Sequence, residues 1–287
     1  MNKLALGTVQ FGLDYGINNK SGQTSKAEIE KILDLAFSSG IDCLDTAQAY
    51  GDSETILGEV LNDGKKFNII SKLDSKNIFN VCSSFEISLK NLRVSQLYGF
   101  LYHDFNSYKN NVDSIKYLLD YKSEGKINKI GFSLYYPDQL EFLFNENIPV
   151  DLIQVPYNIF DRRFESFFQE AQKRDIEIHI RSVFLQGCFF LNPDHLPSFL
   201  SKIKNKIEKL RKLSEQNKIS LNSLCLNFVN INEYIDKIII GVDTQDNLRD
   251  NIEALNEVEE FTLLKNEMFD LQENDEKILL PFNWGKE

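Results

Sequence analysis

Residues 26–47 read KAEIEKILDLAFSSGIDCLDTA, and this stretch contains the pattern that decides the fold. The first part, Lys26–Ser39, predicts an amphipathic helix, with apolar side chains at helical spacing at Ile29, Ile32, Leu33 and Ala36. The second part, Ile41–Leu44, is a short apolar run that predicts a buried strand. A helix that leads directly into a buried strand is the repeating unit of an α/β protein.

The same unit recurs along the chain. Eight strands are predicted, at Leu4–Thr8, Ile41–Leu44, Asn68–Ser71, Gln96–Tyr102, Lys129–Phe132, Asp151–Val155, Glu177–Ile180 and Lys237–Ile240. Further helical stretches lie between or after them, at Asn77–Leu92, Val112–Ser123, Pro137–Phe144, Arg163–Lys173, Ser220–Val229 and Asp246–Leu255. Alternating strands and helices predict parallel pairing. Eight such units match the usual size of about 250 residues for a closed (β/α)₈ TIM barrel.

An open, doubly wound sheet is the main alternative architecture. Such a sheet normally carries a GxGxxG turn after its first strand, and that fingerprint is missing here. Gly7 and Gly12 lie near the first strand, but their spacing does not fit it. The closed barrel is therefore the favoured fold.

The chain is predicted to form a single domain over residues 1–287, because no linker or change of composition divides it. Residues of about 188–217 exceed what the seventh unit needs, and we expect an inserted loop followed by a helix over Ser198–Gln216. The segment of about 260–287 is expected to be a C-terminal tail. Its end, Pro281-Phe282-Asn283-Trp284, is apolar enough to pack on the barrel.

Composition limits the classes of partner. The net charge of −11 argues against a nucleic acid or an anionic membrane as partner. No apolar run approaches the roughly 20 residues that a membrane span needs, and the N-terminus does not resemble a signal peptide. We therefore expect a cytoplasmic protein. The four cysteines have no metal-ligand spacing and are expected to be reduced and structural.

Polar residues follow the predicted strands at the end where barrel enzymes carry their catalytic groups. Closing the sheet would bring Asp45, Tyr50, Lys72 and His103 to one rim. A tyrosine phenol has a pKa near ~10, and a lysine beside it would stabilise the phenolate and lower that pKa. The aspartate would hold the lysine, and the histidine would orient a carbonyl. No side chain can supply hydride, so a cofactor must.

Each of these residues also has an ordinary interpretation. A lone aspartate at a strand end is usually a cap or turn residue, a lone lysine is usually solvated, and a lone histidine is usually structural. Finding all four at consecutive strand ends is a much rarer coincidence. A metal-dependent barrel enzyme is disfavoured, because only three histidines are present and no ligand cluster is visible.

The chain resembles the aldo-keto reductases from Leu4 to about Leu255. The most specific block is residues 40–47, GIDCLDTA, followed by Tyr50-Gly51 and by Glu54, Leu57 and Gly58. Lys72 in IISK and His103 in LYHD match the other two members of the family's tetrad. By resemblance Tyr50 is the general acid, Lys72 paired with Asp45 tunes its pKa, and His103 positions the substrate carbonyl.

The resemblance also implies a cofactor site. Ser133 and Gln154 match residues that bind the nicotinamide carboxamide, and Asp250 and Asn251 match residues at the adenine end. The last loop, Gly241 to Asn247, would hold phosphates near a helix N-terminus. The complete predicted set is Gly7, Thr8, Ser133, Gln154, Arg181, Ser182, Leu185, Gly241, Asn247, Asp250 and Asn251. No metal site is expected.

Three positions depart from the family pattern. Leu134 replaces an asparagine, and Arg181 replaces the aromatic residue that often stacks on the nicotinamide. A guanidinium plane can also stack on a ring. Asn247 stands where many members place an arginine on the 2′-phosphate, although Arg249 lies nearby. NADP(H) is the favoured cofactor, with NAD(H) as the alternative.

The predicted function is reduction of an aldehyde or ketone by an NAD(P)H-dependent oxidoreductase. The alternative is a regulatory or sensor subunit that binds the cofactor with little turnover, which would require a large apolar docking surface. Aromatic and polar residues in the first loop, Phe11–Gly22, and at Tyr135 and Tyr136 favour a sugar-like small-molecule carbonyl. A monomer or a weak homo-oligomer is expected.

Overall fold

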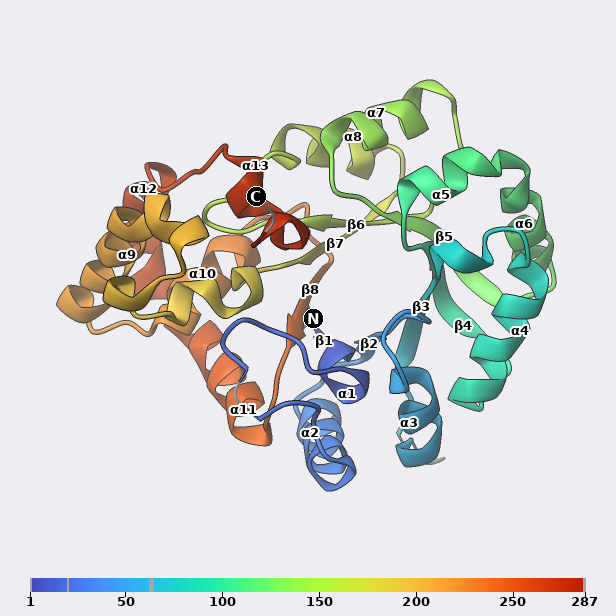
Figure 1. Ribbon diagram of the computed structural model, residues 1–287, viewed down its shortest axis with the longest axis horizontal. Helices are drawn as coiled ribbons and strands as arrows, with labels where there is room; N and C mark the ends of the chain where they lie inside the picture. The colour runs from blue at the N-terminus through green and yellow to red at the C-terminus, as the bar shows by residue number, and fades with distance from the viewer. Residues whose placement is uncertain (1, 20, 62–64, 286–287) are drawn as a thin grey trace.

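The computed structural model describes residues 2–19, 21–61 and 65–285. Among these residues, eight parallel strands close into one barrel in chain order, and helices surround them (Figure 1). The strands are β1 (Leu4–Gly7), β2 (Cys43–Asp45), β3 (Asn68–Leu73), β4 (Leu97–Tyr102), β5 (Ile127–Ser133), β6 (Leu152–Pro156), β7 (Glu177–Arg181) and β8 (Lys237–Gly241). The predicted (β/α)₈ barrel is confirmed.

The barrel closes between its first and last strands. Leu4 pairs with Ile238 and Gly7 pairs with Gly241 in parallel register. The strands are almost continuously apolar because residues inside the barrel and residues beneath the helices are both buried. The inner layer is a small cluster of Ala5, Cys43, Ile70, Leu101, Leu152 and Ile239.

The main crossover helices are α2 (Lys26–Ser38), α3 (Ser53–Val60), α4 (Val81–Leu92), α6 (Ile115–Ser123), α7 (Pro137–Asn145), α8 (Phe168–Lys173), α10 (Leu221–Asn230) and α11 (Gln245–Ala254). Additional helices are α1 (Val9–Gly12), α5 (Phe105–Asn110), α9 (Lys204–Asn217), α12 (Val258–Phe269) and α13 (Glu276–Leu279). Side-chain caps stabilise the N-termini of several helices; for example, Ser25 before α2 accepts a hydrogen bond from the Glu28 amide. None of the described helices is long and apolar enough to span a membrane.

The segment between β7 and α9 contains three 3₁₀ turns. They are η4 (Leu185–Phe190), η5 (Pro193–His195) and η6 (Ser198–Ile203). The single helix expected over Ser198–Gln216 is therefore wrong in its first part, which is 3₁₀, and the α-helix begins at Lys204. The tail packs on this segment, where the rings of Trp284 and Phe199 are 5.7 Å apart.

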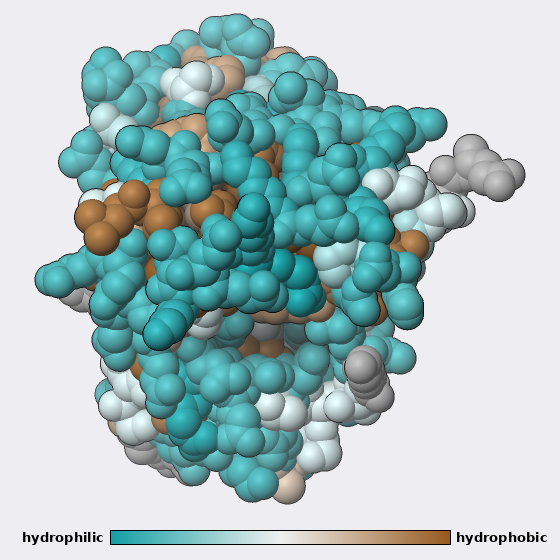
Figure 2. Space-filling view, turned by 90° about the vertical axis from the view of Figure 1, so that its left-hand side faces the viewer, coloured by the Kyte–Doolittle hydropathy of each residue, from teal (hydrophilic) through white to brown (hydrophobic). Residues whose placement is uncertain are grey.

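Further short 3₁₀ turns lie at or beside the ends of four predicted helices, and one lies in the C-terminal tail. They are η1 (Ser75–Asn77), η2 (Val112–Ser114), η3 (Glu165–Phe167), η7 (Leu255–Glu257) and η8 (Pro281–Asn283). All four cysteines are free, and three of them are buried. The face formed by α9 and its neighbours is largely hydrophilic, with apolar surface confined to limited patches (Figure 2).

The alternation of side chains along each strand places the polar residues at the barrel mouth. Side chains two residues apart on a strand point the same way. Asp45 follows Cys43 by two residues, Lys72 follows Ile70, His103 follows Leu101 and Gln154 follows Leu152. Each of these polar side chains therefore points into the barrel, one layer above an apolar residue of the inner layer.

Candidate active site

The four predicted catalytic residues meet at the C-terminal ends of three adjacent strands. Asp45 ends β2, Lys72 lies near the end of β3, and His103 directly follows β4. Tyr50 lies in the loop between β2 and α3. The structure thus places these four residues together.

Lys72 is the centre of this group and is completely buried. Its Nζ lies 2.7 Å from Asp45 Oδ2, 3.0 Å from the Thr46 carbonyl oxygen and 3.4 Å from the Tyr50 hydroxyl. The other carboxylate oxygen of Asp45 accepts a 2.8 Å hydrogen bond from Gln154 Nε2. The lysine is therefore fixed beside the tyrosine by partners on three sides.

Burial sets the protonation states in the free protein. It raises the pKa of Tyr50 well above its ordinary value, and the charge of Asp45 adds to that increase. The lowered pKa that the sequence predicted for a tyrosine beside a lysine is therefore not found in the free protein. Burial lowers the pKa of Lys72, although Asp45 opposes that change. It lowers the pKa of His103 to about 3, with the charges of Lys72 and Arg181 contributing. At neutral pH the phenol is therefore protonated and the imidazole is neutral.

His103 and Tyr50 are arranged edge to face. Their ring centroids are 5.6 Å apart and their planes are inclined by 84°. Both side chains are only partly buried, and both line the cavity at the barrel mouth. A carbonyl oxygen can therefore approach a neutral imidazole and a phenol from one side.

Two glycines allow the Tyr50 loop to lie close to the end of α1. A Cβ at Gly12 would lie 1.8 Å from the Tyr50 carbonyl oxygen, and one at Gly51 would lie 2.4 Å from the Gly12 carbonyl oxygen. Gly51 also has a φ of +55°. Backbone contact between these two segments, which only glycine permits, positions the tyrosine.

The cavity has a volume of about 670 Å³, within the usual range for ligand sites. It extends from the group around Tyr50 to the loops after β1, β7 and β8. Most of the predicted cofactor residues line it, namely Gly7, Thr8, Ser133, Gln154, Arg181, Ser182, Gly241, Asn247, Asp250 and Asn251. Leu185 does not line it, because its side chain is completely buried in the core.

Two polar atoms in this lining are buried without a hydrogen-bond partner. They are Gln10 Oε1 and Asp243 Oδ1. Gln10 covers Gly241, where a Cβ would lie 2.6 Å from the Gln10 amide nitrogen. The N-terminus of α11 begins nearby, with Thr244 capping the Asn247 amide. Both atoms are acceptors, so they fit a ligand that presents hydroxyl or N–H groups, whereas the N-terminus of α11 fits a phosphate.

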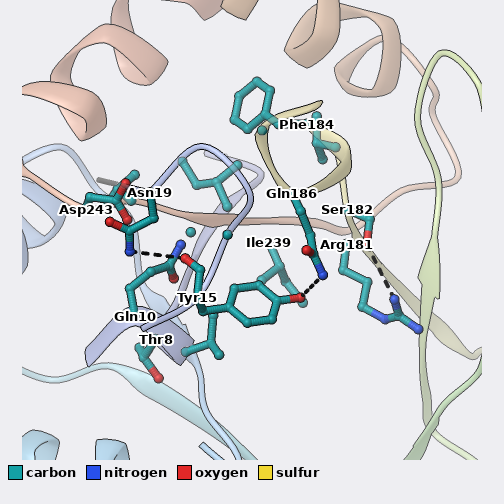
Figure 3. Close-up of a pocket in the computed structure, with 18 of the residues that line it drawn as sticks. Thr8, Gln10, Tyr15, Asn19, Arg181, Ser182, Phe184, Gln186, Ile239 and Asp243 are labelled. Carbon is teal, nitrogen blue, oxygen red and sulfur yellow. Dashed lines mark hydrogen bonds between the residues drawn. The ribbon is translucent and has the colours of Figure 1, made fainter. Parts of the chain in front are cut away.

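A bridge across the cavity was not anticipated from the sequence. Gln186 Nε2 donates a 2.7 Å hydrogen bond to the Tyr15 hydroxyl, joining the loops after β7 and β1 (Figure 3). A Cβ at Gly187 would lie 2.9 Å from Asn18 Cβ, so the two loops also contact beside the bridge. The aromatic residue in a polar loop was the only signal, and it was interpreted as a substrate contact.

The structure shows where the three residues that depart from the family pattern lie. Leu134 is completely buried, and its carbonyl accepts a 3.0 Å hydrogen bond from Arg181 Nη2. Asn247 lines the cavity. Arg249 pairs with Asp246 and is not among the described residues that line the cavity.

Comparisons with known proteins identify the family of the chain. The uncharacterized oxidoreductase YqkF of Bacillus subtilis is 24% identical over 89% of this chain and 92% of its own length. A protein of Escherichia coli named NADH-specific methylglyoxal reductase is 24% identical over 79% of this chain and 82% of its own length. The holo structure of aldo-keto reductase AKR11C1 from Bacillus halodurans matches with a TM-score of 0.71 over 91% of both chains, at 18% identity. The profile of the Aldo/keto reductase family matches residues 3–273, and the chain therefore belongs to this family of oxidoreductases.

Proposed function

We propose that this protein reduces an aldehyde or ketone to an alcohol, with a nicotinamide nucleotide as hydride donor and Tyr50 as proton donor. The observation that carries the proposal is the 3.4 Å separation between the Tyr50 hydroxyl and the Nζ of Lys72, which is itself paired with Asp45. A phenol next to a buried ammonium can donate a proton, because the ammonium stabilises the phenolate that remains.

His103 has a different role in this proposal. Its depressed pKa keeps it neutral, so it can donate one N–H hydrogen bond to the substrate oxygen without competing as an acid. Because its ring meets Tyr50 edge to face, the two groups can hold one oxygen atom between them. His103 orients the carbonyl, and Tyr50 protonates it.

The cofactor would lie along the cavity. Gln154 is held by Asp45 through its amide nitrogen, so its amide oxygen can accept a hydrogen bond from a nicotinamide carboxamide beside Ser133. The start of α11 and Gly241 would hold the phosphates, with Asn247, Asp250 and Asn251 toward the adenosine. When bound, the dinucleotide supplies the hydride that no side chain can supply.

The lining at the adenosine end favours NADH over NADPH, in contrast to the preference expected from the sequence. Asp243 and Asp250 line the cavity, and Arg181 is the one lysine or arginine among its described lining residues. Figure 3 places Asp243 and Arg181 on opposite sides of the Tyr15–Gln186 bridge. A carboxylate can bind a ribose hydroxyl but repels a 2′-phosphate. The name of the E. coli relative accords with this choice.

Binding and turnover test the proposal together. We expect NADH to bind at least tenfold more tightly than NADPH in a fluorescence titration.

We expect Tyr50→Phe to bind NADH normally and to lose at least 100-fold in the reduction of sugar aldehydes and simple aromatic aldehydes. The matched control, Tyr117→Phe, alters an exposed tyrosine of α6 and should retain activity. Full activity in Tyr50→Phe would disprove the proton-donor role. Cofactor binding without turnover in the wild type would favour a sensor subunit.

A further inference from the structure

Arg181 is the last residue of β7, and its side chain enters the same cavity as Tyr50 and His103. It is partly buried. Figure 3 shows it beside Ser182 at the edge of the drawn site. Arg181 is the one lysine or arginine among the described residues that line this cavity.

The guanidinium is fixed in place by neutral groups. Nη2 donates to the Leu134 carbonyl at 3.0 Å, and Nη1 lies 3.4 Å from Ser182 Oγ. Its central carbon lies 4.1 Å from the centroid of the Tyr135 ring, which packs edge to face on Phe282 at 5.0 Å. Such contacts orient the planar group without neutralising its charge.

No described carboxylate forms an ion pair with Arg181. Arg163, Arg174 and Arg249 each have such a partner, namely Asp161, Glu170 and Asp246. The other described arginines without one, Arg93, Arg162 and Arg211, do not line this cavity. In the cavity, Asp45 is already neutralised by Lys72. An arginine has five N–H groups, and the two bonds described above use two of them. No described protein group accepts a hydrogen bond from the others.

Given the proposed reductase function, on which this inference rests, we propose that Arg181 binds a carboxylate of the carbonyl substrate. The planar fork of a guanidinium matches the two oxygens of a carboxylate. One unpaired guanidinium balances one negative charge, whereas a phosphate monoester brings about 1.5 to 2. The substrate class is therefore an aldehyde or ketone that also carries a carboxylate.

The test compares a charged substrate with its neutral counterpart. Succinic semialdehyde and its methyl ester share the aldehyde and differ in the charge of the other end. We expect the wild type to have a higher kcat/KM for the acid than for the ester. In Arg181→Gln the acid-to-ester ratio should fall by about 10- to 100-fold, because charged hydrogen bonds are lost. Arg181→Lys should recover part of the ratio, and Arg174→Gln, which alters an exposed pair on α8, should leave it unchanged.

Binding separates this inference from the proposed reduction. Succinate is titrated into the NADH-loaded wild type and the NADH-loaded Arg181→Gln protein by calorimetry, which requires no turnover. Weaker succinate binding in the variant supports the carboxylate site even if no carbonyl is reduced. The inference would be overturned if kcat/KM in Arg181→Gln fell equally for the acid and the ester. Loss of NADH binding in Arg181→Gln would also overturn it and would assign the arginine to the cofactor.

Discussion

The Tyr15 hydroxyl accepts a 2.7 Å hydrogen bond from Gln186 across 171 residues of sequence. This bond joins the loop after β1 to the loop after β7 above the cavity. A ligand that lies beneath the bridge must leave either past it or after the loops separate. We therefore expect the bridge to slow the release of a ligand.

We predict that Tyr15→Phe accelerates release of the cofactor by about 2- to 10-fold, which corresponds to the loss of one hydrogen bond. Stopped-flow displacement of bound NADH measures this rate. Partial desolvation at the cavity wall raises the pKa of Tyr15 to about 12, although 39% of the residue is exposed. The effect should persist at pH 9, because even an ordinary phenol is mostly neutral there. Identical release rates for Tyr15→Phe and the wild type would show that the bridge does not retain the ligand.

Lys72→Met should lower the free energy of unfolding by about 3–5 kcal/mol, because it leaves the buried Asp45 carboxylate without its cation. Denaturant unfolding measures this loss. Adding Asp45→Asn should restore part of the stability. The surface control, Lys116→Met, removes an exposed pair with Asp113 and should cost less than about 1 kcal/mol. Equal losses in the two lysine variants would contradict the role of burial.

His103 should make stability depend on pH. Its folded pKa of about 3 lies below the ordinary value of 6.5, so the unfolded chain binds its proton first. The stability contributed by the neutral histidine is present above about pH 6.5 and is lost as the pH falls toward 3. His103→Gln should remove this pH-dependent contribution to the free energy of unfolding. The difference in unfolding free energy between wild type and variant should change by at most about 1.4 kcal/mol per pH unit below 6.5. A constant difference from pH 7 to pH 4 would refute the shift.

Gly12→Ala should displace the Tyr50 loop, because the added methyl would overlap the Tyr50 carbonyl oxygen. A displacement of about 1 Å at the proton donor can cost about 100-fold in rate. The control, Gly125→Ala, places a methyl in open space at a φ of +74°. It should cost about 1 kcal/mol in stability and leave activity intact. Equal activity in the two variants would exclude this role for Gly12.

The sequence contained enough information to predict the barrel and the central group of the site. Apolar strands separated by helices predict the topology, and the two-residue period from Ile70 to Lys72 places a polar side chain at the mouth. These features are local, so a reading of the chain can detect them.

Other features could not be predicted from the sequence, because they depend on contacts between residues that are distant in sequence. Helix α3 was not assigned, and Gly58 within it weakens the helical pattern. The structure explains that glycine, since a Cβ would lie 2.0 Å from the Asn91 carbonyl oxygen. Helix α12 was also missed, and its Leu263 is 84% exposed, which obscures its amphipathic pattern. The Tyr15–Gln186 bridge has no local signature at all.

The pairing of β1 with β8 has a consequence for biosynthesis. Leu4 precedes its partner Ile238 by more than 200 residues, so it leaves the ribosome long before Ile238 is made. Until then the first strand exposes unpaired backbone groups, which can recruit other strands. The barrel can close only after most of the chain has been translated, and pairing over so long a separation is slow. Chains truncated before Lys237 lack β8 and should therefore aggregate.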